Sequence, residues 1–293
     1  MPNKIIIFAS IIKKLDSYMK CFLGLFSVLL LLFSCGGNKP SEQKNVMRED
    51  TTVVKDIPAD LPQLSEAEPP VAADGVFDDF AFNFMSNRRF QSERILFPLK
   101  YVVDGKETQI EMDKWTFDPL YSKKEIYTMI FDSKKSMKNQ KDPDLAHVVV
   151  EWIYLTKNRV KQYVFDKTEG RWMMTSLIDE QLKENENSDF LNFYKQFSRD
   201  RSYQIKHIQS PFSLILQDPD TYKPISGVGD PVQWQDFAPE LPKGVITNIN
   251  YGQKYTNSKQ RLLMVAASDG AMSSIITFKK VRGQWMVTRL ENN

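Results

Sequence analysis

The stretch FDKTEGRWMMTSL at residues 165–177 returns as FKKVRGQWMVTRL at residues 278–290, and this duplication decides the fold. Its shared Phe, Lys, Gly, Trp, Met, Thr and Leu stand at one constant offset of 113 residues. The same offset relates an earlier set of residues, in which Phe77, Phe80, Phe84, Arg88, Gln91, Ile95 and Pro98 recur as Phe190, Phe193, Phe197, Arg201, Gln204, Ile208 and Pro211. About a hundred residues have therefore been copied end to end, and each copy is expected to bury a face of its own.

Each copy is predicted to begin with a helix that carries one aromatic face. Phe77, Phe80 and Phe84 lie at i, i+3 and i+7, which places their rings on one side of a helix. We interpret this stripe, and its counterpart in the second copy, as core packing against a sheet. The alternative is the aromatic wall of a ligand cavity.

Short-range signals predict the boundaries of these helices and of the short turns after them. Asp74 and Asn187 precede the two helices at equivalent positions and are expected to cap them. A helical turn is predicted over residues 91–96 and again over 204–209. Pro98 and Pro211 are expected to end these turns, because proline cannot continue a helix.

The second half of each copy has the pattern of an antiparallel meander with glycine turns. The expected strands cover residues 125–131, 147–155, 160–165 and 172–178 in the first copy, and 245–251, 261–267, 273–278 and 285–290 in the second. A hairpin around Asp104-Gly105 precedes the first meander, with strands at 99–103 and 108–112, and residues 212–216 form the matching strand of the second copy.

The last strand of each copy carries a prediction about burial. Alternation places Met173, Thr175 and Leu177 on one face of the strand and Trp172 on the other. Only the face with Met173 is identical in both copies, so we expect that face to be buried.

The order of elements resembles the nuclear transport factor 2-like, cystatin-related cone, and the whole chain is similar to Bacteroidales lipoproteins of unknown function that carry such domains. The resemblance covers about residues 76–293 and rests on element order and aromatic placement. It implies an α+β fold of two tandem cones, each a helix packed in a curved antiparallel sheet. The expected repeats are residues 76–181 and 187–293. Because this fold hosts enzymes, binding proteins and assembly modules alike, the resemblance implies no activity.

The N-terminal residues have the pattern of a lipoprotein signal. Lysines precede an apolar run at 21–33, which is too short for a transmembrane helix of roughly 20 residues. The run ends in Ser34-Cys35-Gly36, which looks like a bacterial lipobox. We expect residues 1–34 to be removed and Cys35 to carry lipid, and translation starts at either Met1 or Met19. A cleaved soluble export signal is the alternative.

Residues 35–75 are predicted to be a disordered tether from Cys35. They contain scattered prolines and acidic residues without an aromatic side chain. Loss of the signal leaves 35 basic residues (39 less four lysines) against 36 acidic ones (37 less one aspartate). The mature chain is thus near neutral, which argues against nucleic acid as a partner.

The inventory of chemical groups predicts no catalytic residue, metal site or cofactor. Both cysteines lie within the signal and its cleavage site, so the folded part has no thiol. His147 and His207 are not shared between the copies, and we interpret both as structural or surface residues. The triplets Asp142–Asp144 and Asp218–Asp220 lack the glycine and distal glutamate of a calcium loop and are predicted to be turns.

Two arginines are the candidate ligand-binding residues. Arg88 and Arg201 are the strongly polar pair that both copies keep near the first helix, and either could hold a carboxylate or phosphate. We interpret both arginines as closing the helix end through a salt bridge, with ligand binding as the alternative. Enzymes of the resembling fold place a Tyr–Asp or Asp–His pair inside the cone. Spacing does not show whether Tyr101, Tyr127, Tyr154 or Asp118 point there.

The sequence therefore favours a non-enzymatic ligand-binding or protein-interaction module, anchored by lipid in the cell envelope. Gly36-Gly37-Asn38-Lys39 lacks an acidic surface-export signal, which favours the periplasmic face of the outer or inner membrane. The expected partners are the membrane, through the anchor, and either a small hydrophobic ligand or an envelope protein. The alternatives are an enzyme of isomerase or hydrolase type using one cone, and a structural subunit of an envelope assembly.

Overall fold

The computed structural model describes residues 74–270 and 272–292. The signal, Cys35 and nearly all of the predicted tether lie outside the described residues. The elements of the first copy are, in order, α2 (Phe77–Ser86), α3 (Arg88–Glu93), β1 (Ile95–Val103), β2 (Lys106–Ile110), η2 (Met112–Lys114), η3 (Leu120–Lys123), β3 (Ile126–Phe131), η4 (Ser136–Lys141), β4 (His147–Tyr154), β5 (Arg159–Thr168), β6 (Arg171–Gln181) and η5 (Leu182–Glu184). Within the described part, no helix is long and apolar enough to cross a membrane.

The second copy repeats this order with small differences. Its elements are α4 (Ser188–Phe197), α5 (Arg201–Lys206), β7 (Ile208–Gln217), β8 (Pro224–Gly229), η6 (Pro231–Gln233), α6 (Trp234–Phe237), β9 (Val245–Asn250), β10 (Gln260–Ala267), β11 (Ser273–Val281) and β12 (Gln284–Asn292). The predicted strands of both copies are confirmed to within a few residues. The Asp104-Gly105 turn is also confirmed, since both residues have positive φ, at 46° and 79°, as a tight hairpin of this type requires.

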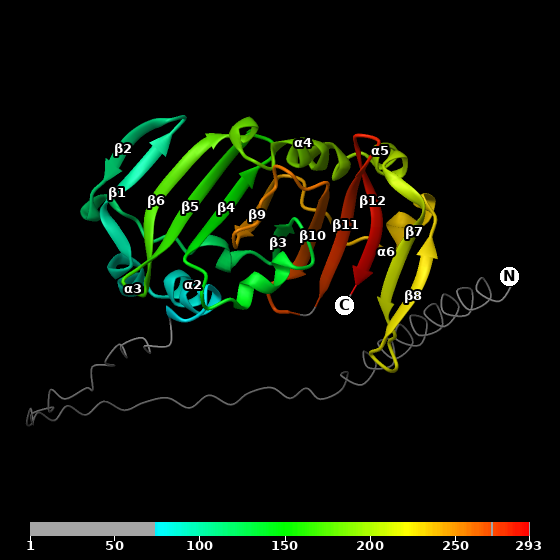
Figure 1. Cartoon of the computed structure of the whole chain (residues 1–293), viewed down its shortest axis with the longest axis horizontal. Coiled ribbons are helices and arrows are strands. Elements are labelled where there is room, and N and C mark those ends of the chain that lie inside the picture. Colours follow the sequence, from blue (N-terminus) through cyan, green and yellow to red (C-terminus); the bar gives the residue numbers. More distant parts are fainter. Residues whose placement is uncertain (1–73, 271, 293) are drawn as a thin grey trace, which may run out of the picture. The chain divides into compact units, whose positions relative to one another are not determined.

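The strands form two six-stranded sheets, which Figure 1 shows side by side. Their orders are β2-β1-β6-β5-β4-β9 and β3-β10-β11-β12-β7-β8. Most neighbours are antiparallel, but β1 runs parallel to β6 and β7 runs parallel to β12. The expectation of wholly antiparallel sheets was therefore wrong in this detail, and the sheets are mixed.

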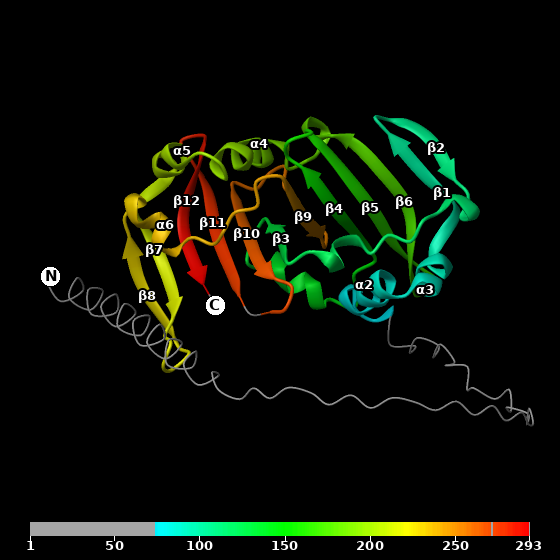
Figure 2. The same ribbon diagram turned by 180° about the vertical axis from the view of Figure 1, so that it is seen from behind.

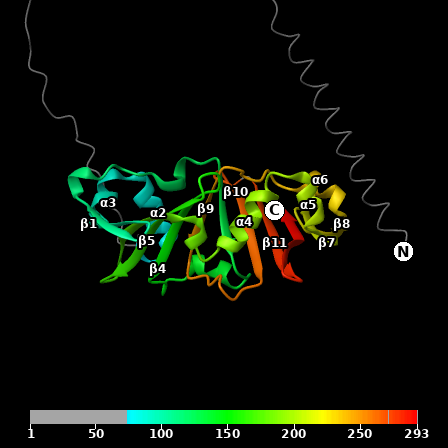
Figure 3. The same cartoon turned by 90° about the horizontal axis from the view of Figure 1, so that it is seen from above.

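One strand of each copy lies in the sheet of the other copy. β3 belongs to the first copy but pairs with β10, and β9 belongs to the second copy but pairs with β4. Both views of the ribbon show β9 beside β4 and β3 beside β10 (Figure 2). From above, β9 and β10 lie near the middle, between β1 and β8 (Figure 3). The predicted four-strand meander is thus a three-strand meander completed by a strand from the other copy.

The phenylalanine stripe packs against the sheet of its own copy, as predicted. Phe77, Phe80 and Phe84 are buried, and the rings of Phe77 and Trp172 lie 5.1 Å apart, edge to face. The second copy repeats this arrangement, with the Phe190 and Trp285 rings 5.3 Å apart. These buried rings form the core of each copy. Their edge-to-face contacts add to the free energy gained from burial.

The prediction for the buried face of the last strand was wrong. Trp172 and Met174 are fully buried, whereas Met173 and Thr175 are partly exposed. Phe165 pairs with Met174 but Val164 pairs with Ser176, so Thr175 is the extra residue of a β-bulge. The bulge moves Leu177 onto the buried face. Thr288 is the extra residue at the same place in β12, so both copies have threonine at the bulge.

The helix ends also differ from the prediction. The short helices begin at Arg88 and Arg201, and the strands that come after them contain Pro98 and Pro211. The two prolines therefore lie within strands and do not end the helices. The side-chain caps are Asn87, which accepts from the Phe90 N–H at 3.0 Å, and Asp200, which accepts from the Ser202 and Tyr203 N–H groups.

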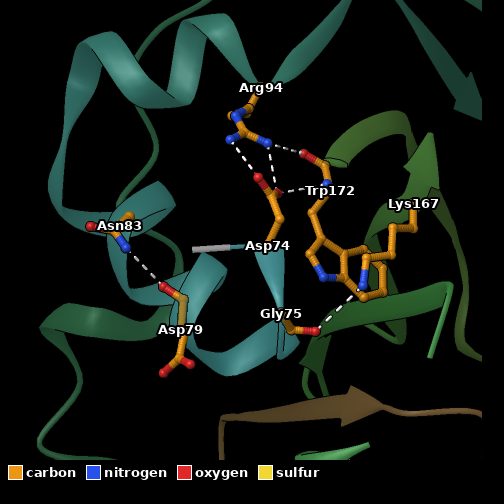
Figure 4. A network of polar contacts seen from close by, with 7 residues as sticks. All are labelled: Asp74, Gly75, Asp79, Asn83, Arg94, Lys167 and Trp172. Atoms are coloured by element: carbon orange, nitrogen blue, oxygen red, sulfur yellow. Dashed lines mark hydrogen bonds and ion pairs between the residues drawn. The ribbon is translucent and has the colours of Figure 1, made fainter. Parts of the chain in front are cut away.

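Asp74 does not cap α2; it forms an ion pair with Arg94, after α3, and accepts a hydrogen bond from β6 (Figure 4). Arg94 donates to both carboxylate oxygens of Asp74, at 2.7 and 2.8 Å, and the Trp172 N–H donates to Oδ1 at 2.9 Å. Burial raises the pKa of Asp74, but these hydrogen bonds outweigh it and hold that pKa below its usual value. Asn187, the equivalent residue, likewise makes no cap and accepts from Arg261 Nε at 2.7 Å.

Candidate ligand-binding site

The two candidate arginines occupy equivalent positions but different surroundings. Both are exposed and begin their short helices. The Arg88 guanidinium lies over the Phe117 ring, 5.5 Å from its centroid. Arg201 instead borders an open pocket of about 400 Å³. Among residues 74–270 and 272–292, neither arginine forms an ion pair, so the salt-bridge interpretation fails for the described chain.

The pocket beside Arg201, which we call the Arg201 pocket, lies where α4, α5 and α6 meet the segment before β9. Its lining consists of Ser198, Arg199, Arg201, Gln204, Trp234, Gln235, Ala238, Pro239, Glu240, Leu241 and Lys243. Three of these residues are cationic and one is anionic. The pocket therefore favours an anionic group, and arginine side chains suit a carboxylate or phosphate because of their planar donor geometry.

A polar network forms the wall of the Arg201 pocket. Gln204 is buried, donates to the Phe197 carbonyl at 2.7 Å and accepts from Gln235 Nε2 at 2.6 Å. Arg199 donates to the Lys243 carbonyl, which ties the end of α4 to the segment before β9. The buried indole N–H of Trp234 has no partner within the described chain. An unpartnered buried donor beside a cationic pocket adds a group that could bind an anion.

The equivalent place in the first copy has different contacts. Trp115 Nε1 donates to Gln91 Oε1 at 3.0 Å, so the donor that Trp234 leaves unpartnered is satisfied there. Leu120, the counterpart of Pro239, is 4% exposed and belongs to the first core. The pocket is therefore a feature in which the two copies differ.

Asp118 pairs with Tyr163, a tyrosine that the sequence had not singled out. The Tyr163 hydroxyl donates to Asp118 Oδ2 at 2.5 Å, and Lys161 Nζ lies 3.6 Å from the same oxygen. Burial and the Asp118 charge raise the pKa of Tyr163, which therefore stays protonated at physiological pH. The pair holds the segment before η3 against β5. A hydroxyl fixed in this way is a poor general base.

The comparisons with known proteins agree with this fold. Residues 59–292 match the family described as "Domain of unknown function (DUF4348)". The chain belongs to this family. Among solved structures it is similar to an NTF2-like protein from Bacteroides fragilis, with 33% identity and a TM-score of 0.70. That alignment covers 77% of this chain and 99% of the other. No curated protein matches the chain. The predicted α+β, nuclear transport factor 2-like fold is thus confirmed.

The histidines of this DUF4348 chain serve structural contacts. His147 is exposed, and its Nδ1 lies 2.7 Å from Asp166 Oδ1. His207 ends α5, where its ring stacks on Tyr203 and its Nδ1 lies 2.8 Å from the Tyr203 carbonyl. Both positions match the structural or surface interpretation from the sequence.

The Asp-Pro-Asp triplets are turns, as predicted. Asp142 accepts from the Asp144 N–H at 3.0 Å, and Asp218 accepts from the Asp220 and Thr221 N–H groups. Such contacts are the aspartate-to-backbone bonds that favour turns. The described residues contain no group of three or more His, Cys, Asp or Glu side chains that could hold a metal ion.

Sequence reasoning missed several residues of the pocket wall. Gln91 and Gln204 were visible as an identical pair, but a glutamine gives no signal that distinguishes a buried bonding role from an exposed one. Trp234 was visible as the counterpart of Trp115. In the first copy the glutamine oxygen accepts from the Trp115 indole, whereas in the second copy it accepts from Gln235. The first copy has Thr116 at the position of Gln235.

Proposed function

We propose that this protein is a lipid-anchored, non-catalytic binding module of the cell envelope that holds an anionic small molecule in the Arg201 pocket. The observation that carries the proposal is the difference between two copies of one scaffold. In the first copy Trp115 is bonded to Gln91 and Leu120 is buried, whereas in the second copy the equivalent residues, Trp234 and Pro239, line an open pocket with three cationic side chains. A volume of about 400 Å³ suits a small organic ligand.

The lining of the pocket favours binding over catalysis. It contains no histidine, aspartate or tyrosine, and its single carboxylate, on Glu240, is exposed. General acid–base chemistry needs a titratable group with a matched pKa in reach of the substrate. Charged donors without such a group can hold and orient an anion but supply no proton transfer.

The anchor is proposed from the sequence. The apolar run before Cys35 and the glycines after it support lipidation of that cysteine. A flexible tether of this length spans on the order of 35 Å root-mean-square, so the folded part would lie a few nanometres from the bilayer. A binding module held in this way would keep its ligand near the membrane, on the periplasmic side.

The experiment compares Arg201→Gln with its matched control, Arg88→Gln. The full-length protein in detergent is titrated calorimetrically with citrate, succinate and inorganic phosphate. We expect at least one of these anions to bind, and Arg201→Gln to weaken binding about tenfold to a hundredfold, as loss of a charged hydrogen bond predicts. Arg88→Gln should leave the affinity unchanged. Equal weakening by both variants, or no binding of any of these anions by the wild type, would refute the proposal.

A further inference from the structure

A second pocket lies on the other face of the second sheet. Phe278 packs its ring on α4, and its neighbours Thr277 and Lys279 must therefore face the opposite side. That side holds a pocket of about 460 Å³, which we call the Lys279 pocket. It is lined by Lys134, Gln209, Ser213, Gln260, Leu262, Thr277, Lys279, Val281, Thr288 and Arg289. It shares no residue with the Arg201 pocket.

The Lys279 pocket is rich in positive charge and contains an unsatisfied hydroxyl. Lys134 and Arg289 both pair with Glu291, at 2.9 Å in each case. Lys279 is exposed and has no ion pair within the described residues. The hydroxyl of Thr277 is buried, with the residue 6% exposed, and it has no hydrogen-bond partner in that part of the chain. Native proteins rarely leave such a group unpaired, and a bound group could satisfy it.

The first copy has a carboxylate at the place that corresponds to the Lys279 pocket. At the equivalent place, Asp166 accepts from the Thr175 hydroxyl at 2.5 Å and contacts His147 Nδ1 at 2.7 Å. Thr175 also lies 3.5 Å from the Val164 carbonyl. The second copy keeps the threonine of the bulge and its carbonyl contact, Thr288 to Thr277 at 3.3 Å. The carboxylate is gone, because Lys279 stands where Asp166 stands in the first copy.

We propose that the Lys279 pocket binds the carboxylate of a small organic acid. The bound carboxylate takes the place that the Asp166 carboxylate fills in the first copy. It accepts from the hydroxyls of Thr288 and Thr277 and pairs with the ammonium of Lys279. The two places are equivalent residue by residue, because the register of β11 with its neighbours equals that of β5.

Reversing the charge at position 279 gives the variant that tests the proposal most directly. Lys279→Asp places an internal carboxylate at the position equivalent to Asp166, so the variant should occupy its own site. We expect it to fold and to bind organic acids at least tenfold more weakly. Thr288→Val, which removes only the hydroxyl, should weaken binding severalfold. Lys106→Asp makes the same charge change on the exposed edge strand β2 and should bind as the wild type does.

The measurement is site-resolved amide chemical shift change in the full-length protein in detergent micelles. Succinate should shift Thr277, Lys279 and Thr288 in the wild type and in Arg201→Gln, but not in Lys279→Asp. This pattern separates the inference from the proposed function, because the two pockets are tested by different residues. Inorganic phosphate alone shifting these amides would overturn the carboxylate assignment. The absence of any shift with succinate would overturn the site itself.

Discussion

Thr128 and Thr247 hydrogen-bond to each other's backbone across the junction of the two sheets. Thr128 N–H donates to Thr247 Oγ1 at 2.9 Å, and Thr247 N–H donates to Thr128 Oγ1 at 3.0 Å. Each hydroxyl also donates to the other residue's carbonyl, at 2.6 and 3.0 Å. The two residues are 119 apart, the same offset that separates Trp115 from Trp234. The contact between the two copies is therefore reciprocal at this point, as it is where a two-fold axis relates two subunits.

Thr247→Val tests this junction. The substitution keeps the shape of the side chain but leaves the buried N–H and C=O of Thr128 without partners. We expect the free energy of unfolding to fall by about 1–3 kcal/mol. Urea denaturation measures it, with Thr108→Val as the control, because Thr108 is an exposed strand threonine with one hydroxyl contact. If both variants lose the same stability, the junction has no special role.

Asp74→Asn tests the ion pair with Arg94 and its pH dependence. The folded-state pKa of Asp74 lies below the ordinary value of 3.8. Its contribution to stability is therefore fully present well above pH 3.8 and is lost as the pH falls below 3.8 through the folded-state pKa. At pH 7 we expect a loss of about 1–3 kcal/mol, since the bonds involve charged groups but Asp74 is partly exposed.

Urea denaturation at pH 7 and pH 3 measures this effect. The difference between wild type and Asp74→Asn should shrink at pH 3. Glu93→Gln is the control, because its pair with Arg89 is exposed and is expected to contribute below about 1 kcal/mol. A difference that stays constant between the two pH values would show that Asp74 does not act through its charge.

Gln91→Leu tests how residues 115–120 of the first copy are held in place. Gln91 is fully buried and donates to the Phe84 and Asp118 carbonyls while it accepts from Trp115 Nε1 and the Asp118 N–H. Loss of these bonds should cost about 2–4 kcal/mol of stability, because buried partners remain unpaired. Hydrogen exchange should speed up at residues 115–120 before the rest of the copy. Gln109→Leu on exposed β2 is the control, and uniform exchange would contradict the local role.

Cys35→Ala tests the proposed anchor. If Cys35 is acylated, the variant should move from the membrane fraction to the soluble fraction and lose incorporation of labelled palmitate. Processing of the wild type should be sensitive to globomycin, which inhibits lipoprotein signal cleavage. Cys21→Ala is the matched control, since Cys21 lies within the apolar run. A Cys35→Ala protein that stays membrane-bound would refute the anchor.

The elements of the fold were predictable because their signals are local. The i, i+3, i+7 spacing of Phe77, Phe80 and Phe84 fixes one helical face within three turns, and Asp104-Gly105 fixes a hairpin within four residues. The buried face of β6 was not predictable from alternation. One extra residue, Thr175, reverses which side chains face the core after it, and a bulge depends on the neighbouring strand.

Only the arginines of the candidate site, and not the pocket around one of them, could be predicted from the sequence. The repeat singled out Arg201 and Arg88 equally as candidate ligand-binding residues. What separates them is their surroundings, because Arg88 lies over the Phe117 ring whereas Arg201 borders an open pocket. That depends on segments distant in the sequence, whose packing no local pattern reports.

The sequence by itself determined the duplication, the order of helices and strands, and the aromatic core of each copy, because each is set by spacing within one copy. The partners of β3 and β9, the Thr128–Thr247 junction and the two pockets were decided only by the tertiary structure. The physical reason is that two similar copies offer each of these strands two similar sheet edges. Only the packing of the whole folded unit determines which edge it joins, and which side chains then meet around open space.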